Sequence, residues 1–279
     1  MIATTILVAI SYIEIHPPDL IKIGLVVVAL QILNIRYRRQ QEAPLIAVIN
    51  GACLLITFAG FYAVATYMVP EHASRLWDKT FVAWDAALGL STDAIVRSVR
   101  SIEWLDTTFA MIYFCYFLQL GLVVPYTAGV RRSPQRMYSA LAQIFICAIF
   151  ALTIFAFMPA LNAMDYFKYE DLYQTQPIVD HIKSIRAGTF TKLKFEENIQ
   201  GLIQFPSMHA GLAVIFAWEF RHDHKIVFGA LVLWNILVIF SAITTGAHYV
   251  VDIFGGIFIA ILSILIVHWI TREPLRPNQ

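Results

Sequence analysis

Two short segments of the chain each combine a histidine with a second polar group at the start of an apolar run. In the first segment, QFPSMHAGLAV, Ser207 stands two residues before His209. In the second, SAITTGAHYVVDIFGG, His248 and Asp252 are four residues apart, a spacing that puts two side chains on one face of a helix. We expect the Asp252 carboxylate to accept a hydrogen bond from one imidazole nitrogen of His248. The other nitrogen is then available as a base or nucleophile.

Together, two imidazoles, a carboxylate and a hydroxyl are suited to a two-step displacement at phosphorus. One histidine attacks, and the other protonates the leaving oxygen. Each segment alone has an ordinary explanation, because a single histidine at a helix mouth is usually an interface residue and a single HxxxD pattern arises by chance. Two such clusters, each opening an apolar run, favour a functional site.

The composition indicates a membrane protein. Hydrophobic residues make up 59% of the 279 residues and charged residues only 14%, whereas soluble domains average about 25% charged. The formal net charge is +1. Lysine and arginine lie mostly in the loops, so no basic surface of the kind that binds nucleic acid is visible, and we exclude that class of partner.

The apolar runs predict an all-α, polytopic membrane helix bundle, because only helices and closed barrels satisfy their backbone in hydrocarbon. The expected spans lie near residues 20–35, 44–69, 108–127, 139–160, 206–220, 226–245 and 248–270.

The ends of the chain lie outside this main block. The apolar residues 3–15 are either a short first span or a helix lying in the membrane interface, followed by a turn at His16–Asp19. We therefore expect N-terminal apolar segments over 1–43, one membrane domain over 44–270 and a cytoplasmic tail over 271–279.

Alternation of the loops gives the bundle two faces. Ten cations share one face, in short segments: Arg36, Arg38, Arg39, Arg131, Arg132, Arg136, Arg221, Lys225, Arg272 and Arg276. The positive-inside rule makes this face cytoplasmic. The long connections 70–107 and 161–205, the turn at Thr244–His248 and both histidine clusters lie on the opposite face. Segment 70–107 is read either as helices lying along the headgroups or as an aromatic belt.

Both histidine segments resemble signature motifs of the type 2 phosphatidic acid phosphatase superfamily. FPSMHAG is similar to the second motif, usually Pro-Ser-Gly-His, and SAITTGAHYVVD to the third, Ser-Arg-x5-His-x3-Asp. The residues of both motifs are more similar to those of the inositol phosphorylceramide synthase (inositolphosphotransferase) branch than to the usual family pattern. The resemblance implies a six-helix core, corresponding to 44–270, after one or two N-terminal spans. It also implies a lipid phosphatase or phosphotransferase that needs no metal or other cofactor and acts through a phosphohistidine.

Carried over by position, the resemblance assigns a role to each residue of the two segments. His248 is similar to the nucleophile, Asp252 to the carboxylate that orients it, and His209 to the acid that protonates the leaving group. Ser207 is similar to a hydroxyl that binds phosphate, assisted by the backbone amides of the helix that follows it. The implied substrate is a phospholipid, sphingolipid or polyprenyl phosphate in the bilayer.

The chain departs from the family pattern in its cations. Ala242 stands where the third motif has arginine, and no Lys-x6-Arg-Pro first motif occurs. A phosphoryl group with developing charge needs positive donors. The loop before Ser207 contains KSIRAGTFTKLK, which offers Lys183, Arg186, Lys192 and Lys194. We favour Arg186, because a guanidinium grips phosphate with two bonds; otherwise these charges solvate the loop or touch anionic lipid.

Two other functions fit parts of this pattern. His248 and Asp252 can act as a proton relay in a transporter, although transporters usually bind their substrates near the bilayer midplane. Alternatively, the loss of arginine at Ala242 fits a catalytically inactive lipid-binding protein. Between hydrolysis and transfer, the similarity of both motif sequences to the synthase branch favours transfer.

Overall fold

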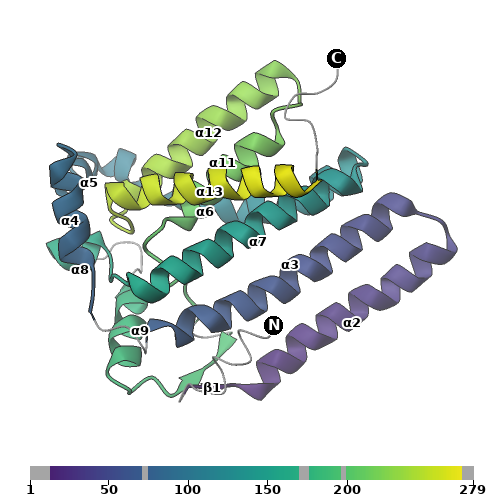
Figure 1. Ribbon diagram of the computed structural model, residues 1–279, viewed down its shortest axis with the longest axis horizontal. Coiled ribbons are helices and arrows are strands. Elements are labelled where there is room, and N and C mark those ends of the chain that lie inside the picture. The colour runs from purple at the N-terminus through teal and green to yellow at the C-terminus, as the bar shows by residue number, and fades with distance from the viewer. Residues whose placement is uncertain (1–12, 71–74, 170–175, 196–198, 272–279) are drawn as a thin grey trace.

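A computed structural model describes residues 13–70, 75–169, 176–195 and 199–271 of the chain. Its long helices lie side by side and form a bundle (Figure 1). They are α2 (Pro17–Arg39), α3 (Ala43–Met68), α6 (Glu103–Val124), which continues into the π-helical turn η2 (Pro125–Val130), α7 (Pro134–Phe157), α11 (Met208–Glu219), α12 (Lys225–Thr244) and α13 (Val250–Thr271). The one sheet in the described residues is a parallel pairing of β1 (Glu14–Ile15) with β2 (Lys192–Leu193).

Within the described residues, six helices are long and apolar enough to cross a membrane: α2, α3, α6 with η2, α7, α12 and α13. Their outer faces carry large apolar side chains that a soluble protein would bury. Phe258 and Trp269 on α13, for example, are 66% and 80% exposed. The exposed apolar belt matches a hydrocarbon surrounding, and the predicted polytopic all-α bundle is confirmed.

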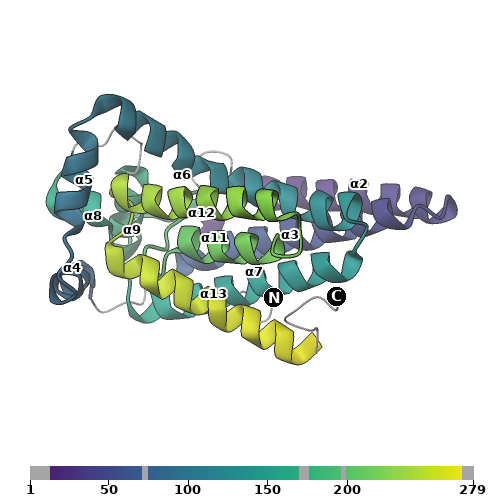
Figure 2. The same cartoon turned by 90° about the horizontal axis from the view of Figure 1, so that it is seen from above.

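Helix α11 is the shortest of the bundle and lies at its centre. Its 12 residues span only about 18 Å, less than the hydrocarbon core of a bilayer. Figure 2 shows it surrounded by α7, α12 and α13. Ile215 and Phe216 are accordingly buried in the main apolar cluster. The sequence predicts a span at 206–220, and the structure places a shorter helix there, enclosed by the others.

Both long connections contain regular structure at one end of the bundle. The 70–107 segment forms α4 (Asp78–Ala87) and α5 (Thr92–Arg100), as the headgroup-helix interpretation expects. The 161–205 segment contains α8 (Ala163–Phe167), α9 (Gln176–Arg186) and β2. Helices α4, α5, α8 and α9 lie together at the left of Figure 1. They cover the ends of the long helices where the two histidine segments begin.

The turns that carry the arginines lie at the other end of the bundle. The α2–α3, η2–α7 and α11–α12 connections gather at the right of Figure 1. There Arg131 and Arg136 pair with Asp223, and Arg136 also bonds to the Glu219 carbonyl. Among the cations predicted for this face, Arg272 and Arg276 lie outside the described residues.

The N-terminal helices form a hairpin on one flank of the bundle. Helix α2 packs on α3, and Asn34 Nδ2 donates to Asn50 Oδ1 at 2.6 Å across the pair. Of the segment 3–15 that is expected to span or to lie in the interface, residues 1–12 are outside the described part. Its last two residues, Glu14 and Ile15, form β1 against β2.

Candidate active site

His248 lies in the tight turn between α12 and α13. Gly246 makes the turn possible, because its φ of 76° is a left-handed conformation that side chains disfavour. A Cβ there would also stand 3.4 Å from Met164 Cβ. After the turn, the His248 amide donates to the Ala242 carbonyl at 3.1 Å, which folds the residue back over the end of α12.

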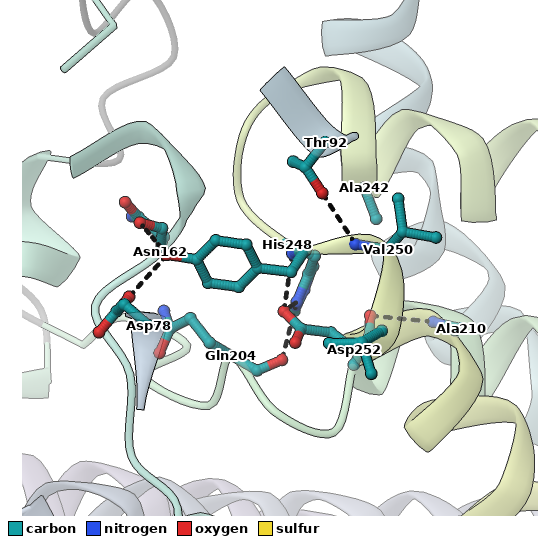
Figure 3. Close-up of polar contacts among 12 residues, drawn as sticks. Asp78, Thr92, Asn162, Gln204, Ala210, Ala242, His248, Val250 and Asp252 are labelled. Carbon is teal, nitrogen blue, oxygen red and sulfur yellow. Dashed lines mark hydrogen bonds and ion pairs between the residues drawn. The ribbon is translucent and has the colours of Figure 1, made fainter. Parts of the chain in front are cut away.

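The partners of His248 fix its tautomer. Its Nδ1 lies 2.8 Å from the Gln204 carbonyl oxygen and 3.3 Å from Asp252 Oδ2, as Figure 3 shows. Both partners can only accept when Asp252 is ionised, so Nδ1 carries the hydrogen and Nε2 keeps its lone pair. The sequence predicts the Asp252 bond, and it gives no sign of the Gln204 carbonyl.

Asp252 joins the two histidine segments. Its Oδ2 also accepts from the Tyr249 amide at 2.9 Å, and its own carbonyl oxygen accepts from the Ser207 amide at 2.9 Å. The side chain is fully buried in the first turn of α13. The turn that carries His248 is thereby tied to the loop that leads into His209.

Gly256 allows the loop before α11 to approach α13. A Cβ at this position would collide with the Ser207 carbonyl oxygen and would stand 3.0 Å from Ala210 Cβ. Ser207 Oγ accepts from the Ala210 amide at 3.4 Å and caps α11. Ser207 is fully buried in this position. The structure therefore shows it as a helix cap, and its phosphate-binding role stays a prediction.

His209 lies beside His248, with 5.5 Å between the ring centroids. Two tyrosines of α6 hold its ring: Tyr113 stacks on it at 4.1 Å and 23°, and Tyr116 meets it edge-on at 4.1 Å. His209 Nε2 is buried and has no hydrogen-bond partner among the described residues. The two histidines that the sequence places at the same membrane depth are thus neighbours, and neither α6 tyrosine was predicted.

A cavity of about 430 Å³ opens onto both histidines. Helices α3 and α6 form much of its wall, with further side chains from α7, α11 and the 199–204 segment. Its polar lining includes Tyr62, Asn162 and Gln200. Of the described residues that line it, none is Lys, Arg, Asp or Glu. An apolar cavity with a few convergent polar groups is the usual form of a small-molecule site.

The predicted cations lie at this end of the bundle without lining the cavity. Lys183 on α9 binds Asp165 Oδ1 at 2.8 Å, and Lys192 is exposed in β2. Arg186 is half-buried at the end of α9. Their contact with a phosphate stays a prediction. Ala242 stands where the family motif has arginine, and its side chain is buried in an apolar cluster with Ala210.

Two buried acids of α4 support the site, and the sequence interpretation missed both. Asp85 accepts from the Val250 and Val251 amides at 3.2 and 2.8 Å, so it caps the start of α13 from another helix. Asp78 accepts from the Tyr249 hydroxyl at 2.8 Å and from the Leu161 amide. The only available signal was acidic residues in a tryptophan-rich amphipathic segment, which does not identify a partner.

A tyrosine of α3 anchors the segment that precedes Gln204. The Tyr67 hydroxyl accepts from the Gln200 amide at 2.9 Å and lies 3.0 Å from His181 Nδ1. Burial lowers the pKa of His181, which keeps the ring neutral and able to accept the tyrosine hydrogen. Tyr67 therefore helps to place the carbonyl that holds His248.

One comparison with known proteins gives a match. A family model described as the PAP2 superfamily matches residues 79–266, which is more than half of the chain. The matched region runs from α4 to near the end of α13 and includes both histidine segments, whereas α2 and α3 lie before it. No curated protein and no solved structure matches the chain.

Proposed function

Because this chain belongs to the PAP2 superfamily, we propose that it transfers a phosphoryl group from a membrane lipid. The transfer proceeds through a phosphohistidine at His248. Members of this superfamily are generally phosphatases or phosphotransferases, and the helices make this chain an integral membrane protein. One observation carries the proposal for His248. Its Nδ1 is held by two acceptors, so Nε2 is the free nucleophilic nitrogen in a cavity that His209 also lines.

In the first step, His248 Nε2 attacks phosphorus with its lone pair. The bond from phosphorus to the leaving oxygen breaks, and that oxygen takes a proton from His209. The phosphorylated ring is positively charged while Nδ1 keeps its hydrogen. Asp252 and the Gln204 carbonyl, which accept that hydrogen, stabilise this charge.

In the second step, an acceptor hydroxyl gives its proton to His209 and its oxygen attacks phosphorus. The bond between phosphorus and His248 Nε2 breaks, which restores the free imidazole. Water as acceptor gives hydrolysis, and an alcohol gives transfer. The similarity of both motif sequences to the inositolphosphotransferase branch supports transfer. The proposed donor is a phospholipid, a sphingolipid or a polyprenyl phosphate.

Charge on the transferring group needs donors besides the histidines. Ser207 and the amides that begin α11 are proposed for this role, together with Arg186 and, after it, Lys183 and Lys192. The proposal needs the end of α9 to turn toward the cavity when substrate binds. The site is further proposed to face away from the cytoplasm, because the arginine-bearing turns lie at the opposite end of the bundle.

The test is a turnover assay on purified protein with a panel of lipid phosphates, in which mass spectrometry detects both free phosphate and new phospholipid. We expect an acid-labile phosphoenzyme in the wild type and none in His248→Ala. His268→Ala, a histidine change at the far end of α13, the helix that follows His248, is the matched control and should retain turnover. Full activity of His248→Ala would end the mechanism. Wild-type protein that turns over nothing in the panel would favour the inactive lipid-binding alternative.

A further inference from the structure

The cavity extends away from the histidines along one face of α3. Leu55, Ala59, Ala63 and Thr66 line it at intervals of three or four residues, the spacing of a single helix face. Thr66 is eleven positions after Leu55, so this wall of the cavity is about 16 Å long at 1.5 Å per residue. The cavity therefore runs parallel to the membrane-spanning helices.

The lining changes character along this length. Near the histidines it includes Thr66, Asn162 and Gln204, and at the deep end it includes Leu55, Phe58 and Leu120. Helix α3 ends near the site, at Met68, and its earlier residues lie deeper in the bundle (Figure 1). A polar mouth above an apolar channel has the polarity of a lipid molecule, with its phosphate beside the histidines and its chain below them.

The channel is also open at the side. Phe114 and Phe117 of α6 line it and are nevertheless 51% and 57% exposed. Ala59 of α3, which faces the same cavity, is exposed as well. Both helices are apolar enough to cross a membrane, so the gap between these side chains opens into hydrocarbon. A chain can therefore pass from the bilayer into the cavity without crossing water.

We propose that α3 and α6 form the hydrocarbon-chain site of the lipid substrate and that Ala59 and Ala63 set the length of chain that fits. The inference rests on the proposed function for the position of the phosphate. Alanine leaves the channel wide at these two points, one helical turn apart. Helix α3 lies before the family-matched residues 79–266, whereas α6 lies within them.

The first test places a phenylalanine at each depth. Ala63→Phe blocks the channel near the histidines and should accept only the shortest chains of a series of the turned-over lipid. Ala59→Phe blocks it about 6 Å deeper and should reject only the longer chains. For rejected chains we expect kcat/KM to fall by about tenfold or more, with turnover of the shortest chain kept. Equal losses at every chain length in both variants would overturn the proposal.

Ala230→Phe is the matched control for this series. Ala230 is exposed on the membrane-spanning helix α12 and does not line the cavity. The same substitution there should leave the chain-length profile of the wild type unchanged. A shift in its profile as large as that of Ala59→Phe would show that the changes reflect general damage to the bundle.

The second test needs no turnover. A long-chain alkyl phosphate with a diazirine at the end of its chain is bound to the His248→Ala protein and activated by light. We expect label on α3 around Leu55 and on α6 around Leu120, and competition by long but not short alkyl phosphates. Label spread over the lipid-facing helices without competition would overturn the chain site. Specific label in a protein whose wild type has no turnover would retain the chain site and reject the proposed function.

Discussion

A single oxygen of Asp252 holds both the ring of His248 and the backbone that follows it. Oδ2 accepts from His248 Nδ1 and from the Tyr249 amide, while the Gln204 carbonyl accepts from the same Nδ1. The tautomer of His248 therefore has two supports, one charged and one neutral. At the residue scale, the carboxylate and the carbonyl have separable effects: both keep the hydrogen on Nδ1, and the carboxylate alone adds negative charge.

Asp252→Asn tests that separation. The amide oxygen can still accept from Tyr249, and the Gln204 carbonyl still selects the tautomer, so the main loss is the negative charge beside His248 Nδ1. Hydrogen bonds to charged groups contribute about 1.5–3 kcal/mol, so we expect the rate of phosphoenzyme formation to fall roughly ten- to a hundredfold. Rapid-quench measurement of that rate is the readout. A loss as complete as that of His248→Ala, or no loss, would contradict this account.

Arg186→Ala tests the predicted cation. Loss of a well-placed donor at a developing oxyanion costs about 3–4 kcal/mol, which is roughly a hundred- to a thousandfold in turnover. Arg186→Lys should recover only part of this, because an ammonium lacks the planar fork of a guanidinium. Loss of a charge that only solvates the loop costs well under about 1 kcal/mol. Turnover of Arg186→Ala within about threefold of wild type would reject Arg186 and move the search to Lys183, Lys192 and Lys194.

At the scale of elements, the site depends on how closely the α11 loop approaches α13. Gly256 is the contact point, because a methyl group there meets the Ser207 carbonyl oxygen, which is backbone and cannot rotate away. The Ser207 amide donates to the Asp252 carbonyl. Separation of the two segments would therefore move His209 away from His248.

Gly256→Ala should both destabilise the protein and reduce turnover. Overpacking of a buried contact costs about 1–3 kcal/mol, so we expect a lower midpoint of thermal unfolding in detergent as well as a slower phosphoenzyme step. The matched control is Gly229→Ala on α12, where a Cβ meets nothing within 4 Å. That change should leave turnover unchanged and be neutral or slightly stabilising. Equal behaviour of the two variants would show that the close approach is unimportant.

At the scale of the whole molecule, the two ends of the bundle differ in charge and in content. One end holds the arginine-bearing turns, and the other holds α4, α5, α8, α9 and both histidine segments (Figure 1). By the positive-inside rule, the site is predicted to face away from the cytoplasm.

Cysteine labelling tests this orientation. A cysteine at the exposed Ala187, which follows α9, should react with an impermeant maleimide added to intact cells. A cysteine at the exposed Ala43, the first residue of α3 beside the α2–α3 turn, should react only after lysis. The reverse pattern would overturn the predicted orientation. The native Cys53 and Cys147 are buried, and Cys115, which is partly exposed, is replaced in the background protein.

The sequence alone was sufficient for features that depend on local composition. A bilayer requires about 20 apolar residues per spanning helix, so the runs that became α2, α3, α7, α12 and α13 could be recognised one at a time. The pairing of His248 with Asp252 could also be predicted locally, because the two residues are only four apart. His248 nevertheless lies in the turn before α13 and not on the helix face that the spacing predicts.

Only the tertiary structure decided the partners that come from distant segments. The Gln204 carbonyl lies 44 residues from His248, and Asp85 caps the start of α13 from 166 residues away. The α3 residues that line the cavity are also far from the histidines in the sequence. The predicted loop cations do not line the cavity, and Lys183 pairs with Asp165. Periodicity and composition report which side of an element is apolar, but a carbonyl or carboxylate finds its donor through the packing of whole helices, which no local pattern specifies.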